Sequence, residues 1–272
     1  MRNSEWSLHS AFRTPHSEFE VTVPLHSTEA IVIGGHDLAE ADRIVVFYTE
    51  AFGKVRAVAA GARRIRTKRF GGNLQLFTQG QLVYFERPSK TLHKVNEFAV
   101  VRSHQRLRED LDRLMLGCTG VEAVAAGVEE GDVSPELYRL LAEGLQLLED
   151  TSRPYLVMQG FLLHLLRLLG YLPELSVCVR CRKATPSRDG AYLSPTQGGV
   201  LCAGCRSGVA DVLPASAATL GFLRGASTST LRIMDRISII PQVLQEVSDI
   251  LQAFLRHVLG RSLRSAEVFS RL

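Results

Sequence analysis

The sequence has no apolar run long enough to cross a bilayer, which takes about 20 consecutive apolar residues. Its most apolar stretch, residues 155–172, is interrupted by Gln159, His164 and Arg167, a pattern typical of a buried helix. The first 21 residues contain no apolar segment that could form the core of a signal peptide. We therefore expect a cytoplasmic protein with no membrane partner.

The motifs of several common enzyme classes are also missing. The chain contains no G-x-x-x-x-G-K-[ST] phosphate loop, no G-x-G-x-x-G dinucleotide motif, no H-E-x-x-H and no G-x-S-x-G. His36 stands beside Asp37, but a single pair of this kind in a turn region is typical of polar surface. We expect no catalytic residues and a protein that is not an enzyme.

Acidic residues are absent between Glu50 and Glu86, although the whole chain has 32 Lys and Arg against 28 Asp and Glu. Residues 28–108 contain 14 basic and 7 acidic residues, a net charge of +7 in a chain whose total is +4. Within this zone, five of the seven residues 63–69 are Arg or Lys. So many adjacent cations favour an anionic partner, and phosphates are the commonest one.

Hydrophobic periodicity separates a polar leader from a β-rich zone. Residues 1–27 have no period, and we interpret them as a flexible leader. Residues 28–108 contain five short segments rich in Val, Ile, Phe and Tyr, with Gly and Pro turns between them. They are residues 30–33, 43–49, 54–59, 81–86 and 94–101. This pattern predicts a nucleic-acid-binding barrel of the OB type, although an SH3-like barrel would leave nearly the same pattern.

The third zone, residues 109–272, has helical periodicity from Leu111 onward. Ser134 and Pro135 suit the cap and first position of a second helix. Further helices are predicted over residues 154–170, 214–226 and 241–260. The predicted fold class is α+β and multidomain, with an N-terminal OB-fold β-barrel followed by an α-helical domain that carries an inserted zinc finger at about residues 176–208.

The zinc finger is predicted from four of the five cysteines, which form two C-x2-C pairs with 20 residues between them. They are Cys178, Cys181, Cys202 and Cys205. Four thiolates suit one tetrahedral Zn²⁺ and leave no open position for water, so the predicted ion is structural. A redox-active cysteine pair is the alternative. Cys118 lies on the apolar face of its helix, where we expect a small buried hydrophobic residue.

The candidate DNA-binding residues lie in the expected third strand and in the basic run where the connection between the third and fourth strands is expected. They are Lys54, Arg56, Arg63, Arg64, Arg66, Lys68, Arg69 and Phe70. The cations would neutralise phosphates, and Phe70 would stack on a base as in other OB barrels. A solvated loop without a ligand is the alternative for the basic run, and an aromatic that anchors the loop is the alternative for Phe70.

Several segments are similar, in order, to one known family. They are Glu40–Arg43 with residues 44–49, Gly53-Lys54, residues 59–64, residues 68–72, residues 169–173 before the first C-x2-C pair, and residues 259–265. Through these motifs the chain resembles the RecO family of bacterial recombination mediators over residues 28–265.

The resemblance implies an OB-fold, a helical domain and a zinc finger whose cysteines some relatives lack. It also implies a nucleoid-associated role in DNA repair: binding single- and double-stranded DNA, annealing complementary strands, and loading recombinase on strands coated with single-strand-binding protein. The implied partners are RecR and the acidic C-terminal tail of single-strand-binding protein. The competing interpretation is an RNA-binding or transcription-associated protein, because OB barrels and zinc ribbons serve both purposes.

Overall fold

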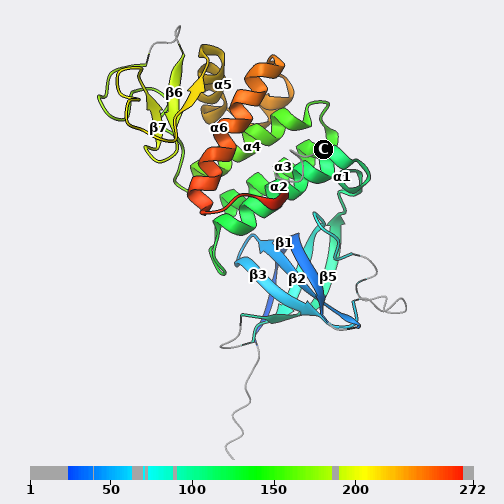
Figure 1. Cartoon of the computed structure of the whole chain (residues 1–272). Helices are drawn as coiled ribbons and strands as arrows, with labels where there is room; N and C mark the ends of the chain where they lie inside the picture. The colour runs from blue at the N-terminus through cyan, green and yellow to red at the C-terminus, as the bar shows by residue number, and fades with distance from the viewer. Residues whose placement is uncertain are drawn as a thin grey trace, which may run out of the picture.

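The computed structural model describes residues 24–38, 40–62, 70, 73–87, 91–185 and 190–265. These residues form a β barrel and a helical domain, with a small cysteine-bearing unit at the end of the helical domain that lies away from the barrel (Figure 1). The predicted fold class, an OB-type barrel followed by a helical domain, is therefore confirmed.

The barrel closes in the order β1-β2-β3-β5-β4. Its strands are β1 (Leu25–Leu38), β2 (Asp42–Thr49), β3 (Gly53–Ala59), β4 (Gln79–Phe85) and β5 (His93–Arg102). Strand β5 lies between β3 and β4 rather than at an edge, as in the Greek-key barrel of the OB fold. Strand β1 begins earlier than expected, because residues 25–27 of the expected leader pair with β4.

Alternation along each strand buries one set of side chains inside the barrel. In β3, for example, Val55, Ala57 and Ala59 are buried and the residues between them are half-buried. The interior is filled mainly by Val, Phe and Leu, including Val45, Phe47, Leu82, Val95 and Phe98. The β-branched and aromatic composition read from the sequence thus becomes a closed apolar core.

The helical domain packs around one central helix. Its helices are α1 (Gln105–Glu109), α2 (Leu111–Gly127), α3 (Pro135–Asp150), α4 (Pro154–Leu168), α5 (Ala217–Thr228), η1 (Leu231–Asp235) and α6 (Pro241–Leu259). Helix α4 is buried along residues 156–166. Ser134 caps α3 as predicted, since its hydroxyl accepts a hydrogen bond from the Leu137 N–H at 3.2 Å. Within the described part of the chain, no helix combines the length and apolar character needed to cross a membrane.

The two domains share one hydrophobic core. Ile31, Tyr48 and Phe77 of the barrel side belong to the same buried cluster as Leu116 of α2. The contact is close at Gly117, where an added Cβ would lie 2.8 Å from Phe77 Cζ. The barrel is therefore held against α2 by direct packing, and not through the linker alone (Figure 1).

Candidate metal centre and nucleic-acid interface

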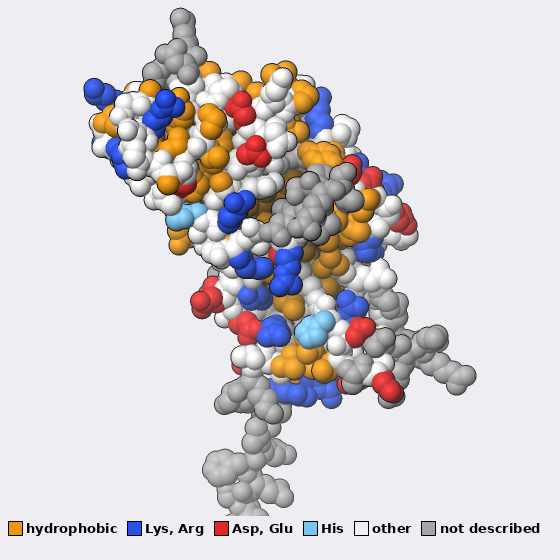
Figure 2. All heavy atoms as spheres, in the orientation of Figure 1, with side chains coloured by type: hydrophobic (Ala, Val, Ile, Leu, Met, Phe, Trp, Pro, Cys, Tyr) orange, Lys and Arg blue, Asp and Glu red, His pale blue; other side chains and the backbone are white. Residues whose placement is uncertain are grey.

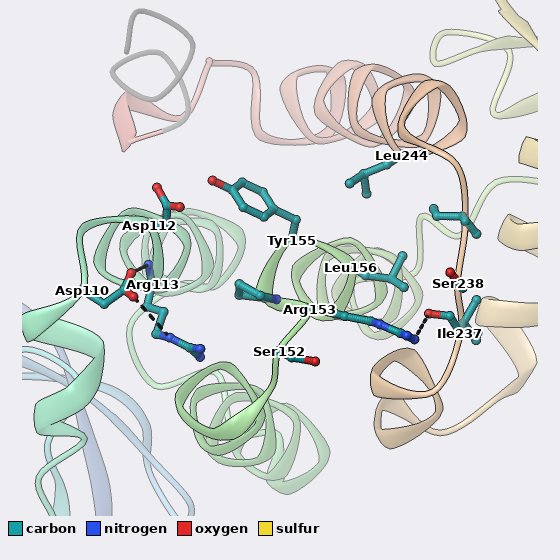
Figure 3. A pocket seen from close by; sticks show the side chains of 12 residues that line it. Asp110, Asp112, Arg113, Ser152, Arg153, Tyr155, Leu156, Ile237, Ser238 and Leu244 are labelled. Atoms are coloured by element: carbon teal, nitrogen blue, oxygen red, sulfur yellow. Dashed lines mark hydrogen bonds and ion pairs between the residues drawn. The ribbon is translucent and has the colours of Figure 1, made fainter.

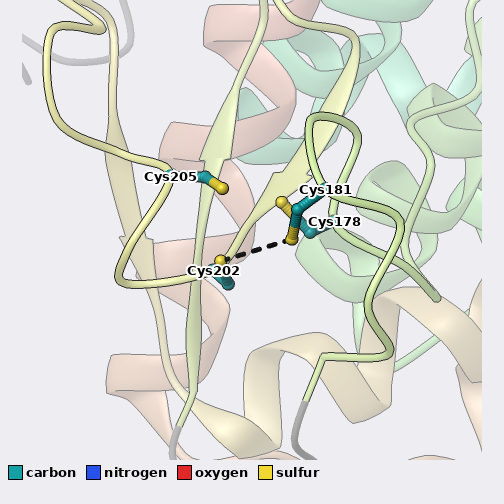
Figure 4. A group of neighbouring side chains, drawn as sticks. All are labelled: Cys178, Cys181, Cys202 and Cys205. Atoms are coloured by element: carbon teal, nitrogen blue, oxygen red, sulfur yellow. Dashed lines mark hydrogen bonds between the residues drawn. The ribbon is translucent and has the colours of Figure 1, made fainter.

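The four predicted cysteines converge in space. Their Sγ atoms all lie within 4.8 Å of one another, and those of Cys181 and Cys202 are 3.8 Å apart (Figure 4). A tetrahedral zinc site with Zn–S bonds of about 2.3 Å places its sulfur atoms about 3.8 Å apart. The donor set and its spacing therefore fit one metal ion bound by four thiolates.

Each C-x2-C pair sits on a tight turn that the backbone defines. In the first turn, the Cys178 N–H donates to the Lys183 carbonyl and the Arg182 N–H donates to the Cys178 carbonyl, both at 2.8 Å. Arg182 adopts a left-handed conformation with φ of 61°. The second turn directly follows β7 (Gly199–Leu201), and in it the Cys205 N–H donates to the Cys202 carbonyl at 3.0 Å. The Arg180 guanidinium links the turns by donating to the Cys205 carbonyl at 3.2 Å.

The thiols of Cys178 and Cys205 have unequal acidities, because their hydrogen-bond partners differ. Burial raises the pKa of the Cys178 thiol, but hydrogen bonds from backbone N–H groups of both turns outweigh this effect and lower the pKa to about 6. Hydrogen bonds with the neighbouring thiols of Cys202 and Cys181 raise the pKa of Cys205 to about 12. Four thiols this close cannot all ionise unless a positive ion balances their charge, and a divalent metal supplies that balance.

The cysteine-bearing unit is built into the helical core. Leu175, Leu193 and Val200 of this unit belong to the main buried cluster of the helical domain. Arg224 of α5 donates to the Leu175 carbonyl at 2.8 Å and to the Thr185 hydroxyl at 2.6 Å. The strands β6 (Ala191–Ser194) and β8 (Leu213–Ala215) complete a three-stranded sheet with β7. A change at the cysteines should therefore also alter the stability of the helical domain.

The basic run itself, Arg63–Arg69, lies outside the described residues, but the residues on both sides of it are held by the barrel. On one side, the Gly61 N–H donates to Asp42 Oδ1 at 2.8 Å. On the other side, Phe70 is packed in the barrel core and is 2% exposed. The run thus leaves from the barrel and returns to it.

The burial of Phe70 corrects one expectation from the sequence. Stacking requires an exposed ring face, and the ring of Phe70 instead contacts the barrel interior together with Leu74. The alternative interpretation, an aromatic that anchors the loop, describes its position. We therefore leave Phe70 out of the proposed DNA-binding set.

The ammonium group of Lys54 also makes its hydrogen bonds within the protein. Its Nζ donates to the carbonyl oxygen of Ala125 at 2.9 Å and to that of Val128, at the C-terminal end of α2. A cation is favourable there, because the last carbonyls of a helix have no partner within the helix. Burial lowers the pKa of the Lys54 ammonium. Lys54 therefore joins the barrel to the helical domain, and it too leaves the proposed DNA-binding set.

We expect Lys54→Met to lower the free energy of unfolding by about 1–3 kcal/mol, because two buried carbonyl oxygens lose their donor while the aliphatic stem remains. Denaturant unfolding measures this change, with Lys94→Met, at an exposed position of β5, as the control variant. The salt dependence of DNA binding should stay that of the parent protein. A flatter salt dependence in Lys54→Met would return Lys54 to the DNA-binding set.

Arg56 is half-buried, but its side chain still reaches solvent. Its Nη1 lies 3.6 Å from Glu130 Oε1, and its side chain is 41% exposed. Figure 2 shows Lys and Arg side chains gathered over the barrel and along its junction with the helical domain, with acidic side chains at the sides. The side chain of Arg56 is thus accessible to a phosphate from solvent.

The sequence carried no signal for one feature of the helical domain, a cavity of about 470 Å³. Its walls come from segments far apart in the chain: Asp110, Asp112 and Arg113, residues 152–156, residues 237–239, and Leu244 (Figure 3). Tyr155, Leu156 and Leu244 supply apolar surface, and the guanidinium group of Arg153 lies beside them. Only the packing of α2, α4 and α6 brings these residues together.

Together the fold and the cysteine cluster define a class of protein, in which an OB-type barrel is joined to a helical domain that carries four clustered thiols able to hold a metal ion. Comparison with models of known protein families narrows this class to one family. Residues 23–104 match the model for the N-terminal domain of recombination protein O, and residues 108–267 match the model for its C-terminal domain. The chain therefore belongs to the RecO family.

Proteins named DNA repair protein RecO are similar to this chain over most of its length. One from Anaeromyxobacter sp. (strain K) is 36% identical over 236 residues, 86% of this chain and 91% of the relative. One from Roseiflexus sp. (strain RS-1) is 34% identical over 241 residues, 89% of this chain and 83% of the relative. One from Syntrophus aciditrophicus (strain SB) is 30% identical over 249 residues, 91% of this chain and 96% of the relative.

Proposed function

We propose that the chain is a recombination mediator in bacterial DNA repair and acts without catalysis, in the cytoplasm at the nucleoid. It binds single- and double-stranded DNA, anneals complementary strands, and assists recombinase loading on strands coated with single-strand-binding protein. The observation that carries the proposal is the separation of charge along the chain. Residues 28–108 have a net charge of +7, whereas the whole chain has a net charge of +4. Membership of the RecO family supports the choice of DNA repair.

Strand annealing follows from the physical chemistry of this surface. Two complementary strands repel each other through their phosphates, and a cationic surface that neutralises those phosphates lowers the barrier to their encounter. Arg56 and the run Arg63–Arg69 provide that surface in our proposal. Pairing of the bases then supplies the free energy, so nucleotide hydrolysis is not required.

We further propose that the cysteine cluster holds one structural Zn²⁺. Zinc bound by four thiolates cross-links the two turns and leaves no coordination position for water. Cys178 is 0% exposed, and Leu175, Leu193 and Val200 of the same unit belong to the core of the helical domain, which supports a structural role for the ion. The ion would then stabilise the helical domain.

Two protein partners complete the proposal. Membership of the family supports RecR as a partner. Co-elution of the two purified proteins tests this binding. For the acidic tail of single-strand-binding protein, the cavity beside α4 offers an apolar floor at Leu156 and Leu244 (Figure 3). Arg153 Nη1 donates to the carbonyls of Asp235 and Ile237, so a carboxylate of the tail would be bound by the remaining N–H groups of this guanidinium. On its other side, Arg113 Nε lies 3.6 Å from Asp110 Oδ2, which reduces the negative charge facing an acidic peptide.

An annealing assay tests the function and the tail site together. We expect the protein to accelerate annealing of both naked strands and strands coated with single-strand-binding protein. Leu244→Asp, which places a carboxylate in the cavity, should keep the effect on naked strands and lose it on coated ones, as should the parent protein when the coating protein lacks its tail. Leu111→Asp, at an exposed position of α2, is the control.

Failure to anneal naked strands would reject the mediator function itself. The RNA-binding alternative predicts tighter binding to RNA than to single-stranded DNA of the same sequence at the same salt concentration. If Leu244→Asp anneals coated strands as the parent does, the tail binds elsewhere.

A further inference from the structure

A second cavity, of about 340 Å³, lies in the seam of the barrel where β3 and β5 barely pair. Only Ala57 with His93 and Val58 with Lys94 are paired between these strands. Beside those pairs, a gap remains between β3 and the end of β4. Glu130, Gly131 and Val133, which follow α2, also line it. A volume of this size falls within the usual range for small-ligand pockets, about 300–1,000 Å³.

Aromatic rings line this cavity. The side chains of Phe52, Tyr84 and His93 all contribute to its wall. The ring centroids of Phe52 and Tyr84 are 6.0 Å apart, and those of Tyr84 and His93 are 5.5 Å apart. Tyr84 is buried, but Phe52 and His93 are half-buried at the cavity.

The turn that carries Phe52 is fixed in advance. The Phe52 N–H donates to the hydroxyl of buried Thr49 at 3.0 Å, and that hydroxyl donates to the Gly53 carbonyl at 2.9 Å. Gly53 has a φ of 63°, and an added Cβ would lie 2.0 Å from the Asp132 carbonyl oxygen. Because these contacts hold the turn without a ligand, little conformational entropy of the turn is lost when a ligand stacks on the ring of Phe52.

The polar groups of the cavity suit a heterocycle joined to a phosphate. The Arg87 N–H donates to His93 Nδ1 at 3.3 Å, so the neutral imidazole carries its proton on Nε2 and is a donor there. Burial lowers the pKa of His93, which keeps the ring neutral at pH 7. The Arg56 guanidinium lines the same cavity with its side chain 41% exposed. Glu86 and Glu130 also line the pocket, and Glu130 Oε1 lies 3.6 Å from Arg56 Nη1, so a phosphate would compete with this carboxylate for Arg56. Rings, a neutral donor and a cation thus share one pocket with two carboxylates.

We propose that this pocket binds an unstacked base of single-stranded DNA, with Phe52 as the stacking surface and Arg56 at the adjoining phosphate. The inference rests on the proposed DNA-binding function and adds a preference for single strands. In a duplex both faces of each base are covered by neighbours, so a duplex base enters only after unstacking and unpairing. Stacking on an aromatic side chain is tolerant of sequence, since every base has a π face.

The experiment uses the full chain and a single-stranded oligonucleotide containing 2-aminopurine, whose fluorescence falls when the base stacks. We expect the parent protein to quench this fluorescence and to bind the single strand more tightly than the matching duplex. Phe52→Leu keeps an apolar side chain in the turn but removes the ring, and should weaken single-strand binding about tenfold with duplex binding and salt dependence unchanged. Phe52→Trp should restore both quenching and affinity.

Tyr171→Leu is the matched control, because Tyr171 is a 56% exposed ring on the helical domain. Quenching and single-strand affinity that survive in Phe52→Leu would overturn the pocket while leaving the proposed function intact. Salt-independent or absent binding by the parent protein would instead overturn the DNA-binding function on which the pocket rests.

Discussion

Cys181→Ala is expected to lose the bound zinc and to unfold at a clearly lower temperature than the parent protein. Three thiolates hold Zn²⁺ more weakly than four, and structural zinc contributes about 10–16 kcal/mol to folding in zinc-finger peptides. Because Leu175, Leu193 and Val200 lie in the core of the helical domain, release of the metal frees residues that the helices pack against. We expect a loss of several kcal/mol in the free energy of unfolding.

The metal content of the purified protein and its thermal unfolding curve measure the two effects. Cys118→Ala is the matched control, since Cys118 is a half-buried cysteine of α2 outside the cluster. It should retain the full complement of zinc. A parent protein that melts at the same temperature with and without metal would show that the cluster is not a structural zinc site.

Replacing Arg63, Arg64 and Arg66 by Glu is expected to weaken binding to single-stranded DNA about 100-fold at low salt and to flatten its salt dependence. Each neutralised phosphate contributes about −0.7 to the slope of log K against log salt concentration on single strands, so three lost contacts reduce the slope by about 2. The fold should survive, because neighbouring Gly61 and Phe70 are held by the barrel.

The control carries the same change in net charge on the helical domain. Arg139, Arg232 and Arg256 are exposed there. Reversing all three breaks two surface ion pairs, which contribute little to stability, and the exposed hydrogen bond from Arg139 Nε to the Pro135 carbonyl. Titrations at several salt concentrations should give this variant nearly the parent slope. Equal affinity of the barrel variant and the parent at low salt would show that the basic run does not contact DNA.

Local patterns predicted much of this fold. The cap at Ser134, the helix starting at Pro154 and the five strands each depend on residues close together in the chain, so composition and period were enough to place them. The barrel class was open between two types, because strand segments alone do not say which strands pair. The parallel contact between β3 and β5 decided it.

The sequence by itself was enough to predict which four cysteines cluster, since each C-x2-C pair is a local turn that presents two thiols on one side. It also determined that the positive charge gathers in residues 28–108. It did not determine what each cation and ring does. Only the tertiary structure turned Lys54 toward α2 and Phe70 into the barrel core, and only it assembled the cavity at Phe52. The partner of Lys54 lies 71 residues away in the chain, and contacts at that separation are set by packing rather than by any local pattern.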